Sequence, residues 1–331
     1  MTDIARRATL AGIVGALLLA GVVFAATRPA PEPRAAPAAT DRWLPLASSP
    51  FIRNEVGAAR IGRRIYVAGG YDAETGGRTT DKVAAYDIKT DSWSTPSSMP
   101  IGVNHPTATA YRGKLYVHGG FTPPHVQSVA TAALQRYDPD RDAWKLMPES
   151  AAPRAAHALV AMKGKLYAAG GADGDTGELT SLEIYNVAKR RWKSGPDMDV
   201  GRSHITASVV KGRMYVIGGR PGNLDVVEAY DPKKHKWSRV ESLNTPRSGI
   251  ASAVVHGKIV VFGGETSAGT IAPVELYRAG LDRWSPLPEM RTPRHGLGGA
   301  SRGGRVFALE GGEQPGGHYS DVLEYLDVGR R

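Results

Sequence analysis

Five arginines stand at one position relative to a recurring pair of glycines, and arginine is a side chain that binds anions. Four of them lie 16 residues before the first glycine of a pair, and the fifth fits if Glu310 holds the first-glycine position. A guanidinium group presents a planar fork of N–H donors that matches a carboxylate or a phosphate. Five such groups together would form a strong anion-binding site. The residues are Arg53, Arg154, Arg202, Arg247 and Arg294.

Glutamates in the same units give these arginines a second interpretation, in which they form ion pairs between strands. The second unit lacks both charges, because Val103 and Gln135 occupy the two positions, and this matched loss favours pairing. The first unit has Arg53 but Ala84, which favours a ligand-facing ring instead. A buried charge must be paired, so both interpretations stay open on the sequence. The glutamates are Glu183, Glu228, Glu275 and, in register, Glu324.

Other candidate ligand contacts lie at positions that escape the repeat. Tyr71 and Phe121 directly follow glycine pairs, and Tyr319 lies in the equivalent loop of the last unit. Such rings could stack on a sugar or a peptide side chain, although single exposed aromatics are also ordinary surface. Four histidines lie one to three residues after the arginine position, out of register with one another, so we expect no metal site. They are His105, His157, His204 and His295.

Composition excludes several kinds of chemistry. The chain has no cysteine, so it has no thiol nucleophile, thiolate zinc site or disulfide. No nucleophilic triad, phosphate-cradling loop or nucleic-acid motif is present. Residues 173–178 alternate oxygen ligands as a calcium loop does, but the longer pattern is absent and we interpret them as a polar turn. We therefore expect no cofactor and no nucleic-acid partner.

The elements that position these residues are set by a repeat. The first glycines of six pairs are 50, 51, 48, 45 and 48 residues apart, and six tryptophans step by 50, 51, 48, 45 and 47. A tyrosine precedes five of the tryptophans by seven residues, and paired β-rich runs with a tight glycine turn precede each glycine pair. Each unit is predicted to be a four-stranded antiparallel sheet. The repeated residues are Gly69, Gly70, Gly119, Gly120, Gly170, Gly171, Gly218, Gly219, Gly263, Gly264, Gly311 and Gly312, with Trp43, Trp93, Trp144, Trp192, Trp237 and Trp284.

This combination of glycine pair, tyrosine and tryptophan at a period near 50 resembles the kelch repeat. The resemblance covers about Asp41 to Asp327 and implies an all-β fold, a six-bladed kelch-type β-propeller. It also implies that the arginine position lies near the mouth of the central channel. We expect the tryptophans to form interblade core and the glycine pairs to meet backbone requirements, either positive φ or close approach.

The ends of the chain predict how the ring closes. In the sixth unit Leu326 takes the tyrosine position, and the matching tryptophan would fall past Arg331. The segment at Trp43 is a fourth strand with no unit before it. We expect the N-terminal strand at Trp43 to complete the last blade, because that pairing removes the only open edge.

The N-terminal segment predicts export. Residues 8–27 form an uncharged run of 20 that follows Arg6 and Arg7, long enough as a helix to span the ~30 Å hydrocarbon core. Residues 1–27 are thus a signal anchor, placing a single transmembrane helix in the cell membrane, or a cleaved signal peptide. Residues 28–40 are a Pro/Ala-rich linker, and residues 41–331 are the propeller, on the extracytoplasmic side of the membrane or secreted or periplasmic after cleavage.

We expect a monomeric, non-catalytic binding module that engages a protein or glycan ligand through one end of the propeller. Residues 41–331 carry 38 basic and 30 acidic groups (42 − 4 and 32 − 2), a net charge of +8 that could favour acidic polysaccharide, anionic lipid or acidic protein. The alternative is a carbohydrate-modifying enzyme, because the architecture looks like that of the bacterial sialic-acid mutarotases. That chemistry needs acid–base groups at the channel mouth, and none can be matched position by position.

Overall fold

A computed structural model of the chain describes residues 42–123, 129–175 and 177–329. The predicted N-terminal helix (residues 1–27) and linker (residues 28–40) lie outside these residues. The described part is all β, apart from one short 3-10 helix, η1 (Ala73–Thr75). It contains no helix that is long and apolar enough to cross a membrane.

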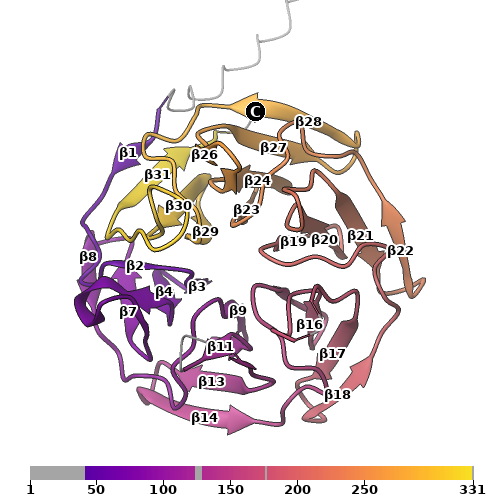
Figure 1. Cartoon of the computed structure of the whole chain (residues 1–331), viewed down its shortest axis with the longest axis horizontal. Helices are drawn as coiled ribbons and strands as arrows, with labels where there is room; N and C mark the ends of the chain where they lie inside the picture. The colour runs from indigo at the N-terminus through magenta and orange to yellow at the C-terminus, as the bar shows by residue number, and fades with distance from the viewer. Residues whose placement is uncertain (1–41, 124–128, 176, 330–331) are drawn as a thin grey trace, which may run out of the picture. The chain divides into compact units, whose positions relative to one another are not determined.

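Six four-stranded antiparallel sheets surround a central channel as the blades of a propeller, as predicted (Figure 1). The first strand of each blade is innermost, and the chain then runs outward strand by strand. In order from the channel, the blades are β3 (Gly57–Ile61), β4 (Arg64–Ala68), β7 (Val83–Asp87) and β8 (Ser92–Ser94); β9 (Thr107–Tyr111), β10 (Lys114–His118), β13 (Leu134–Asp138) and β14 (Ala143–Met147); β15 (Ala158–Met162), β16 (Lys165–Ala169), β17 (Leu182–Asn186) and β18 (Arg191–Ser194); β19 (Thr206–Val210), β20 (Arg213–Ile217), β21 (Val227–Asp231) and β22 (Lys236–Arg239); β23 (Ala251–Val255), β24 (Lys258–Phe262), β27 (Val274–Arg278) and β28 (Arg283–Leu287); and β29 (Gly298–Arg302), β30 (Arg305–Leu309), β31 (Leu323–Asp327) and β1 (Leu44–Pro45).

The ring closes through the N-terminal strand. In β1, Leu44 pairs with Tyr325 and Pro45 with Glu324 of β31, so the first strand of the chain is the outermost strand of the last blade. The backbone N–H of Leu46 extends this ladder by donating to the Leu323 carbonyl at 2.9 Å. The predicted closure at Trp43 is confirmed.

The tryptophans join each blade to its neighbour. Every indole N–H donates to a backbone carbonyl of the preceding blade, so the contact repeats around the whole ring, closure included. The tryptophans therefore lie between blades, but only Trp43, Trp237 and Trp284 are buried core, and Trp93, Trp144 and Trp192 are partly exposed. The six bonds run from Trp43 to Pro288 (3.1 Å), Trp93 to Ala47 (2.8 Å), Trp144 to Ser97 (2.8 Å), Trp192 to Pro148 (2.7 Å), Trp237 to Pro196 (2.8 Å) and Trp284 to Glu241 (2.9 Å).

The glycine pairs meet both backbone requirements that the sequence predicts. In the first five pairs both glycines have positive φ, between 63° and 114°. At Gly69 a Cβ atom would also lie only 2.4 Å from the carbonyl oxygen of Val103 in the next blade. Both conditions favour glycine, because a left-handed backbone disfavours Cβ and a contact this short leaves no room for it.

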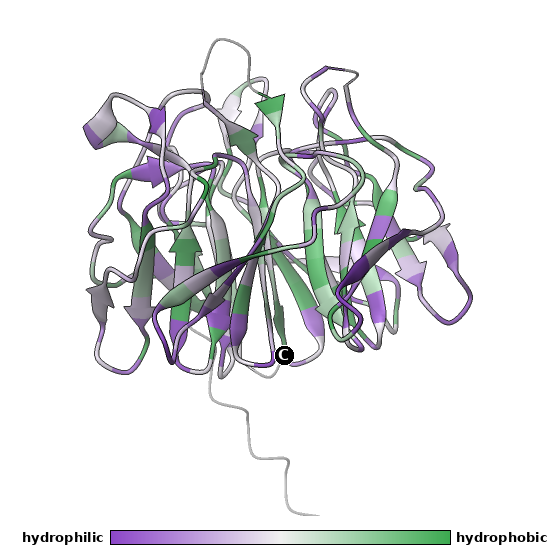
Figure 2. Ribbon diagram, turned by 90° about the horizontal axis from the view of Figure 1, so that it is seen from below, coloured by the Kyte–Doolittle hydropathy of each residue, from purple (hydrophilic) through white to green (hydrophobic). Residues whose placement is uncertain are grey.

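The two ends of the propeller differ (Figure 2). At the turn end, tight turns join the first strand of each blade to the second and, in blades one to five, the third to the fourth. At the loop end, longer segments join the second strand to the third, and the chain enters each innermost strand. The loop end also holds short strand pieces: β2 (Arg53–Asn54), β5 (Tyr71–Asp72), β6 (Arg78–Thr79), β11 (Phe121–Thr122), β12 (Val129–Ala130), β25 (Glu265–Thr266) and β26 (Gly269–Thr270).

Candidate functional site

The five recurring arginines are buried and ion-paired. None has exposed side-chain surface, and each guanidinium meets a carboxylate. This corrects the prediction of a ligand-facing ring, because a ligand in the channel cannot reach a side chain without exposed surface. The pairs are Arg53–Glu310 (2.8 Å), Arg154–Glu183 (2.7 Å), Arg202–Glu228, Arg247–Glu275 (2.7 Å) and Arg294–Glu324 (3.4 Å).

Units one and two, which departed from the sequence pattern, still satisfy the polar groups at this position, each with different partners. Arg53 donates from Nε and Nη2 to both carboxylate oxygens of Glu310, at 2.9 and 2.8 Å. Glu310 of blade six therefore supplies the charge that blade one lacks at Ala84, and it does so from a glycine position, with φ of 55°. In blade two, the neutral Gln135 amide binds the N–H and carbonyl of Ile101 at 2.9 and 3.0 Å.

A second recurring position, two residues after the arginine, surrounds the channel mouth. In all six blades this residue has φ between 49° and 64°. In four blades the backbone N–H of this residue donates to the carbonyl of the equivalent residue in the previous blade. In blades one and four the donor is the N–H of the following residue, and the six bonds measure 2.9–3.5 Å. A closed backbone ring thus holds six side-chain positions in fixed geometry, four of them non-glycine residues in a region that disfavours Cβ. The residues are Glu55, His105, Ala156, His204, Gly249 and Gly296.

Three side chains of this ring and a fourth beside it form what we call the mouth cluster: Glu55, His105 and His204 of the ring, and His295, which precedes the ring residue Gly296. The Glu55 carboxylate bridges two imidazoles, with Oε2 3.3 Å from His105 Nε2 and Oε1 3.2 Å from His295 Nδ1. The rings of His105 and His204 meet edge to face with centroids 5.1 Å apart. Glu55, His105 and His204 also line a cavity of about 140 Å³ at this end of the channel.

Burial and neighbouring charges set the protonation of the cluster. Burial would raise the pKa of the Glu55 carboxyl, but the imidazoles of His105 and His295 beside it hold that pKa below its ordinary value. Burial lowers the pKa of His105, and it lowers the pKa of His204 to about 3. Burial would also lower the pKa of His295, but the hydrogen bond to Glu55 and the charges of Glu55 and Glu265 raise it. At neutral pH the cluster therefore presents an ionised Glu55 with uncharged His105 and His204, and His295 is the imidazole whose charged form Glu55 stabilises.

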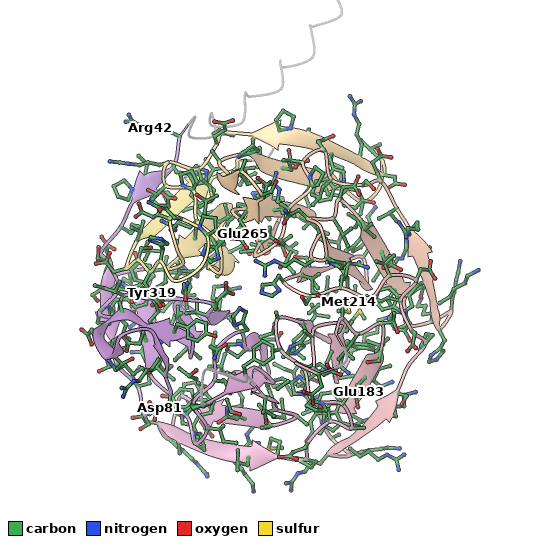
Figure 3. The ribbon with its side chains drawn as sticks, in the orientation of Figure 1. Arg42, Asp81, Glu183, Met214, Glu265 and Tyr319 are labelled. Atoms are coloured by element: carbon green, nitrogen blue, oxygen red, sulfur yellow. The ribbon has the colours of Figure 1, made fainter. Side chains whose placement is uncertain are left out.

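An ion pair borders the cluster on the side of blades four and five. Arg220 pairs with Glu265, which is labelled in Figure 3, and its Nη1 lies 3.4 Å from His204 Nε2. The Arg220 side chain is 41% exposed, in contrast to the buried arginines of the ion-pair ring. Unlike the five recurring arginines, Arg220 is thus an arginine at the loop end that solvent can reach.

The other predicted ligand residues separate into two groups. Tyr71 and Phe121 pack edge-on against His105, with ring centroids 5.7 and 5.6 Å away, so they border the mouth cluster. Tyr319 instead packs its hydroxyl against Gly77 of the neighbouring loop. His157 is buried and bonds to His118 (3.0 Å), which corrects its assignment as a ligand contact.

Three residues of the site escaped the sequence analysis, namely Glu55, Arg220 and Glu265. Glu55 had a usable signal, because it shares the two-residue offset from the arginine with His105 and His204. Arg220 and Glu265 directly follow glycine pairs, as Tyr71 and Phe121 do. In the part of the chain that the structure describes, no group of His, Asp or Glu is arranged as a metal site.

The buried histidines predict acid sensitivity. His118 has a folded-state pKa of about 3 and that of His157 lies well below 6.5, both because of burial, so the unfolded chain takes up protons first as pH falls. The free energy of unfolding should therefore drop below pH 6.5 by about 1 kcal/mol per pH unit for each of the two. His295, with its raised pKa, works in the opposite sense, stabilising below pH 6.5 and losing that contribution as pH rises.

Urea unfolding between pH 7 and pH 5 measures this slope. His118→Gln should flatten it, whereas His256→Gln, at an exposed position of the turn end, should leave it unchanged. Equal slopes in the wild type and both variants would contradict a neutral His118 in the folded state.

Comparison with known proteins agrees with this architecture. Residues 39–219 and 156–328 match the family model described as the KLHDC2/KLHL20/DRC7 Kelch-repeats domain. The chain belongs to the kelch-repeat family, and its fold is the β-propeller of that family.

Individual relatives match only in part. The Kelch-like protein terF of Aspergillus terreus is 29% identical over 189 residues, which is 54% of this chain and 41% of that protein. Kelch-like protein 40 of Xenopus tropicalis is 27% identical over 179 residues, or 53% of this chain and 28% of that protein. The matches thus span less than half of these curated relatives. The solved structure of YjhT superposes with a TM-score of 0.73 at 15% identity, covering 84% of this chain and 95% of that one, and shows the fold alone.

Proposed function

We propose that this protein is a non-catalytic extracytoplasmic binding module that engages a protein or glycan ligand at the loop end. The observation that carries the proposal is the mouth cluster, a set of charged and polar side chains held at one end of the channel by a closed backbone ring. Membership of the kelch-repeat family supports a binding role. The location rests on the uncharged run of residues 8–27.

The chemistry of the mouth favours a ligand that donates hydrogen bonds. Glu55 is an ionised carboxylate, and the recurring arginines that could have attracted an anion are neutralised by their own glutamates. The charge of the exposed Arg220 is balanced by its ion pair with Glu265. Sugar hydroxyls or a basic protein side chain would donate hydrogen bonds to Glu55, and the rings of Tyr71 and Phe121 pack against His105 beside it.

A binding screen of the full chain against arrays of glycans and peptides tests this proposal. For a ligand that binds the wild type, Glu55→Gln should weaken affinity by about tenfold, the effect of one lost charge-assisted hydrogen bond. His204→Ala removes an uncharged imidazole and should weaken affinity by about fivefold. His256→Ala is the matched control, since it removes an imidazole from the turn end. Ligands whose affinity responds to His256→Ala but not to the two mouth variants would contradict the proposal.

A carbohydrate-modifying enzyme, such as a sugar mutarotase, is the second candidate. It is favoured by one observation, a carboxylate within 3.3 Å of two imidazoles beside a cavity, which is a possible acid–base set. The lowered pKa values of Glu55 and His204 weigh against it, because efficient proton transfer needs a pKa near the working pH. Anomer exchange of sugar acids, followed by NMR and abolished by Glu55→Gln, would establish the enzyme over the binding module.

A further inference from the structure

The turn end of the propeller is strongly basic. The six hairpins that join the first and second strands hold 12 lysines and arginines and no acidic residue, counted over residues 60–64, 111–114, 162–165, 210–213, 255–258 and 301–305. Five outer turns join third to fourth strands, and together with residues 327–329 at the end of β31 they hold 10 basic and 8 acidic residues. These turns are residues 87–92, 138–142, 186–191, 231–236 and 278–283. The turn end therefore carries 22 − 8, a net charge of +14.

The rest of the propeller has the opposite sign. Residues 42–329 contain 36 basic and 29 acidic groups, a net charge of +7, so the part outside the turns carries −7. The modest charge of the domain thus hides a large separation of charge between its turn end and its remainder. A separation of this kind orients a molecule in the field of a charged partner.

The basic side chains of the turn end are available to a partner. All 22 are exposed or partly exposed. Carboxylates pair with only a few of them, as in Arg63–Asp87, Lys114–Asp138 and Arg305–Asp327. Burial lowers the pKa of Arg60, and the positive charge of Arg302 in the adjacent blade lowers it further. Cations of adjacent blades therefore lie close enough to repel one another. Mutual repulsion of this kind is relieved when an anionic surface binds.

The position of the first described residue, Arg42, indicates which anionic partner fits. Arg42 lies two residues before β1 begins at Leu44. Leu44 pairs with Tyr325, two residues before β31 ends at Asp327, so Arg42 lies toward the turn end of this strand pair. In the sequence, Arg42 follows the Pro/Ala-rich residues 28–40 and the apolar run of residues 8–27. The turns of this end lie together along one side of the propeller (Figure 2), so they can meet a flat partner at the same time. Leu281, 70% exposed in an outer turn, adds an apolar contact of the kind that enters a lipid interface.

We propose that the turn end docks on an anionic lipid bilayer, with its lysines and arginines on phosphate headgroups. Charged turns then face the membrane, and the loop end with the mouth cluster points away from it. Docking should depend on anionic lipid and weaken with salt, because exposed charge–charge contacts are screened over a Debye length.

The absence of cysteine allows a direct test with the full chain. Ala188→Cys at the turn end and Ala268→Cys at the loop end each offer one exposed labelling site. Energy transfer from the label to acceptor-tagged lipid is measured in nanodiscs of phosphatidylcholine, with or without about 30% phosphatidylglycerol. With the anionic lipid, transfer at position 188 should be at least about twice that at position 268, and about 0.5 M salt should remove the difference. Equal transfer at both positions in anionic discs would overturn the proposal.

Matched charge reversals separate this surface from net charge. Lys163→Glu/Lys211→Glu/Arg302→Glu changes three exposed inner-turn residues and should abolish the difference between the two labels. Arg78→Glu/Lys145→Glu/Arg239→Glu makes the same change of charge outside the turns and should preserve it, with thermal melts confirming that both variants fold. If both triple variants behave alike, or if heparin binds the turn end while the lipid has no effect, the membrane proposal is wrong.

Discussion

Replacing Glu228 with glutamine is expected to lower the free energy of unfolding by about 3–5 kcal/mol. Arg202 and Glu228 both lack exposed surface, and Glu228 also accepts the backbone N–H of Asp199 at 2.8 Å. Glutamine keeps the size of the side chain and an acceptor for that N–H, so the loss isolates the charge. The folded state loses stability because the Arg202 guanidinium stays buried without a counter-charge. Denaturant unfolding measures the change.

Blade two supplies the control for this prediction, because it already has the neutral arrangement. There Val103 and Gln135 stand where the other blades have a charged pair, and both are buried. The double variant Arg202→Val/Glu228→Gln copies that arrangement into blade four. It should recover most of the stability that Glu228→Gln loses, since an apolar replacement of a whole buried ion pair is often close to neutral. A double variant that is less stable than the single one would mean that the guanidinium contributes chiefly through its backbone contacts.

The ring could be predicted from the sequence because its structural positions repeat in residue type as well as in spacing. Each tryptophan makes the same bond to the preceding blade, so one pattern serves six times, and the orphan at Trp43 completes the set. The role of the arginines could not be decided in this way. Arg53 takes its carboxylate from Glu310, 257 residues away and across the ring closure, and no counting within a unit finds such a partner.

Glu55, and with it the arrangement of the mouth cluster, escaped prediction for a different reason. At its ring position the backbone repeats in all six blades, with positive φ, but the residue type changes from blade to blade. Sequence periodicity detects repeated residue types and is insensitive to a repeated conformation that different residues adopt. Glu55 and His295 come together only because blades one and six are neighbours in the closed ring. The basic turn end is likewise a sum over six short turns, none of which is unusual alone.

Removing the side chain of Trp43 should open the propeller at its seam. Trp43→Ala is expected to lower the free energy of unfolding by about 3–5 kcal/mol, the usual range for truncating a buried aromatic. Trp43 is 1% exposed, packs on Phe262 with ring centroids 5.6 Å apart, and donates to Pro288. Because β1 carries only two ladder residues, we expect it to detach from β31 and leave an open edge.

Trp284→Ala separates the seam from ordinary core loss. Trp284 is 5% exposed and makes the equivalent bond to Glu241. Its strand β28, however, is connected through the chain to β27 of the same blade and to β29 of the next blade. Both variants should lose similar stability, whereas only Trp43→Ala should speed amide hydrogen exchange selectively in β31 and promote association through the exposed edge. If β31 stays as protected in Trp43→Ala as in Trp284→Ala, then the backbone ring at the channel mouth, and not the closing strand, holds the last blade in place.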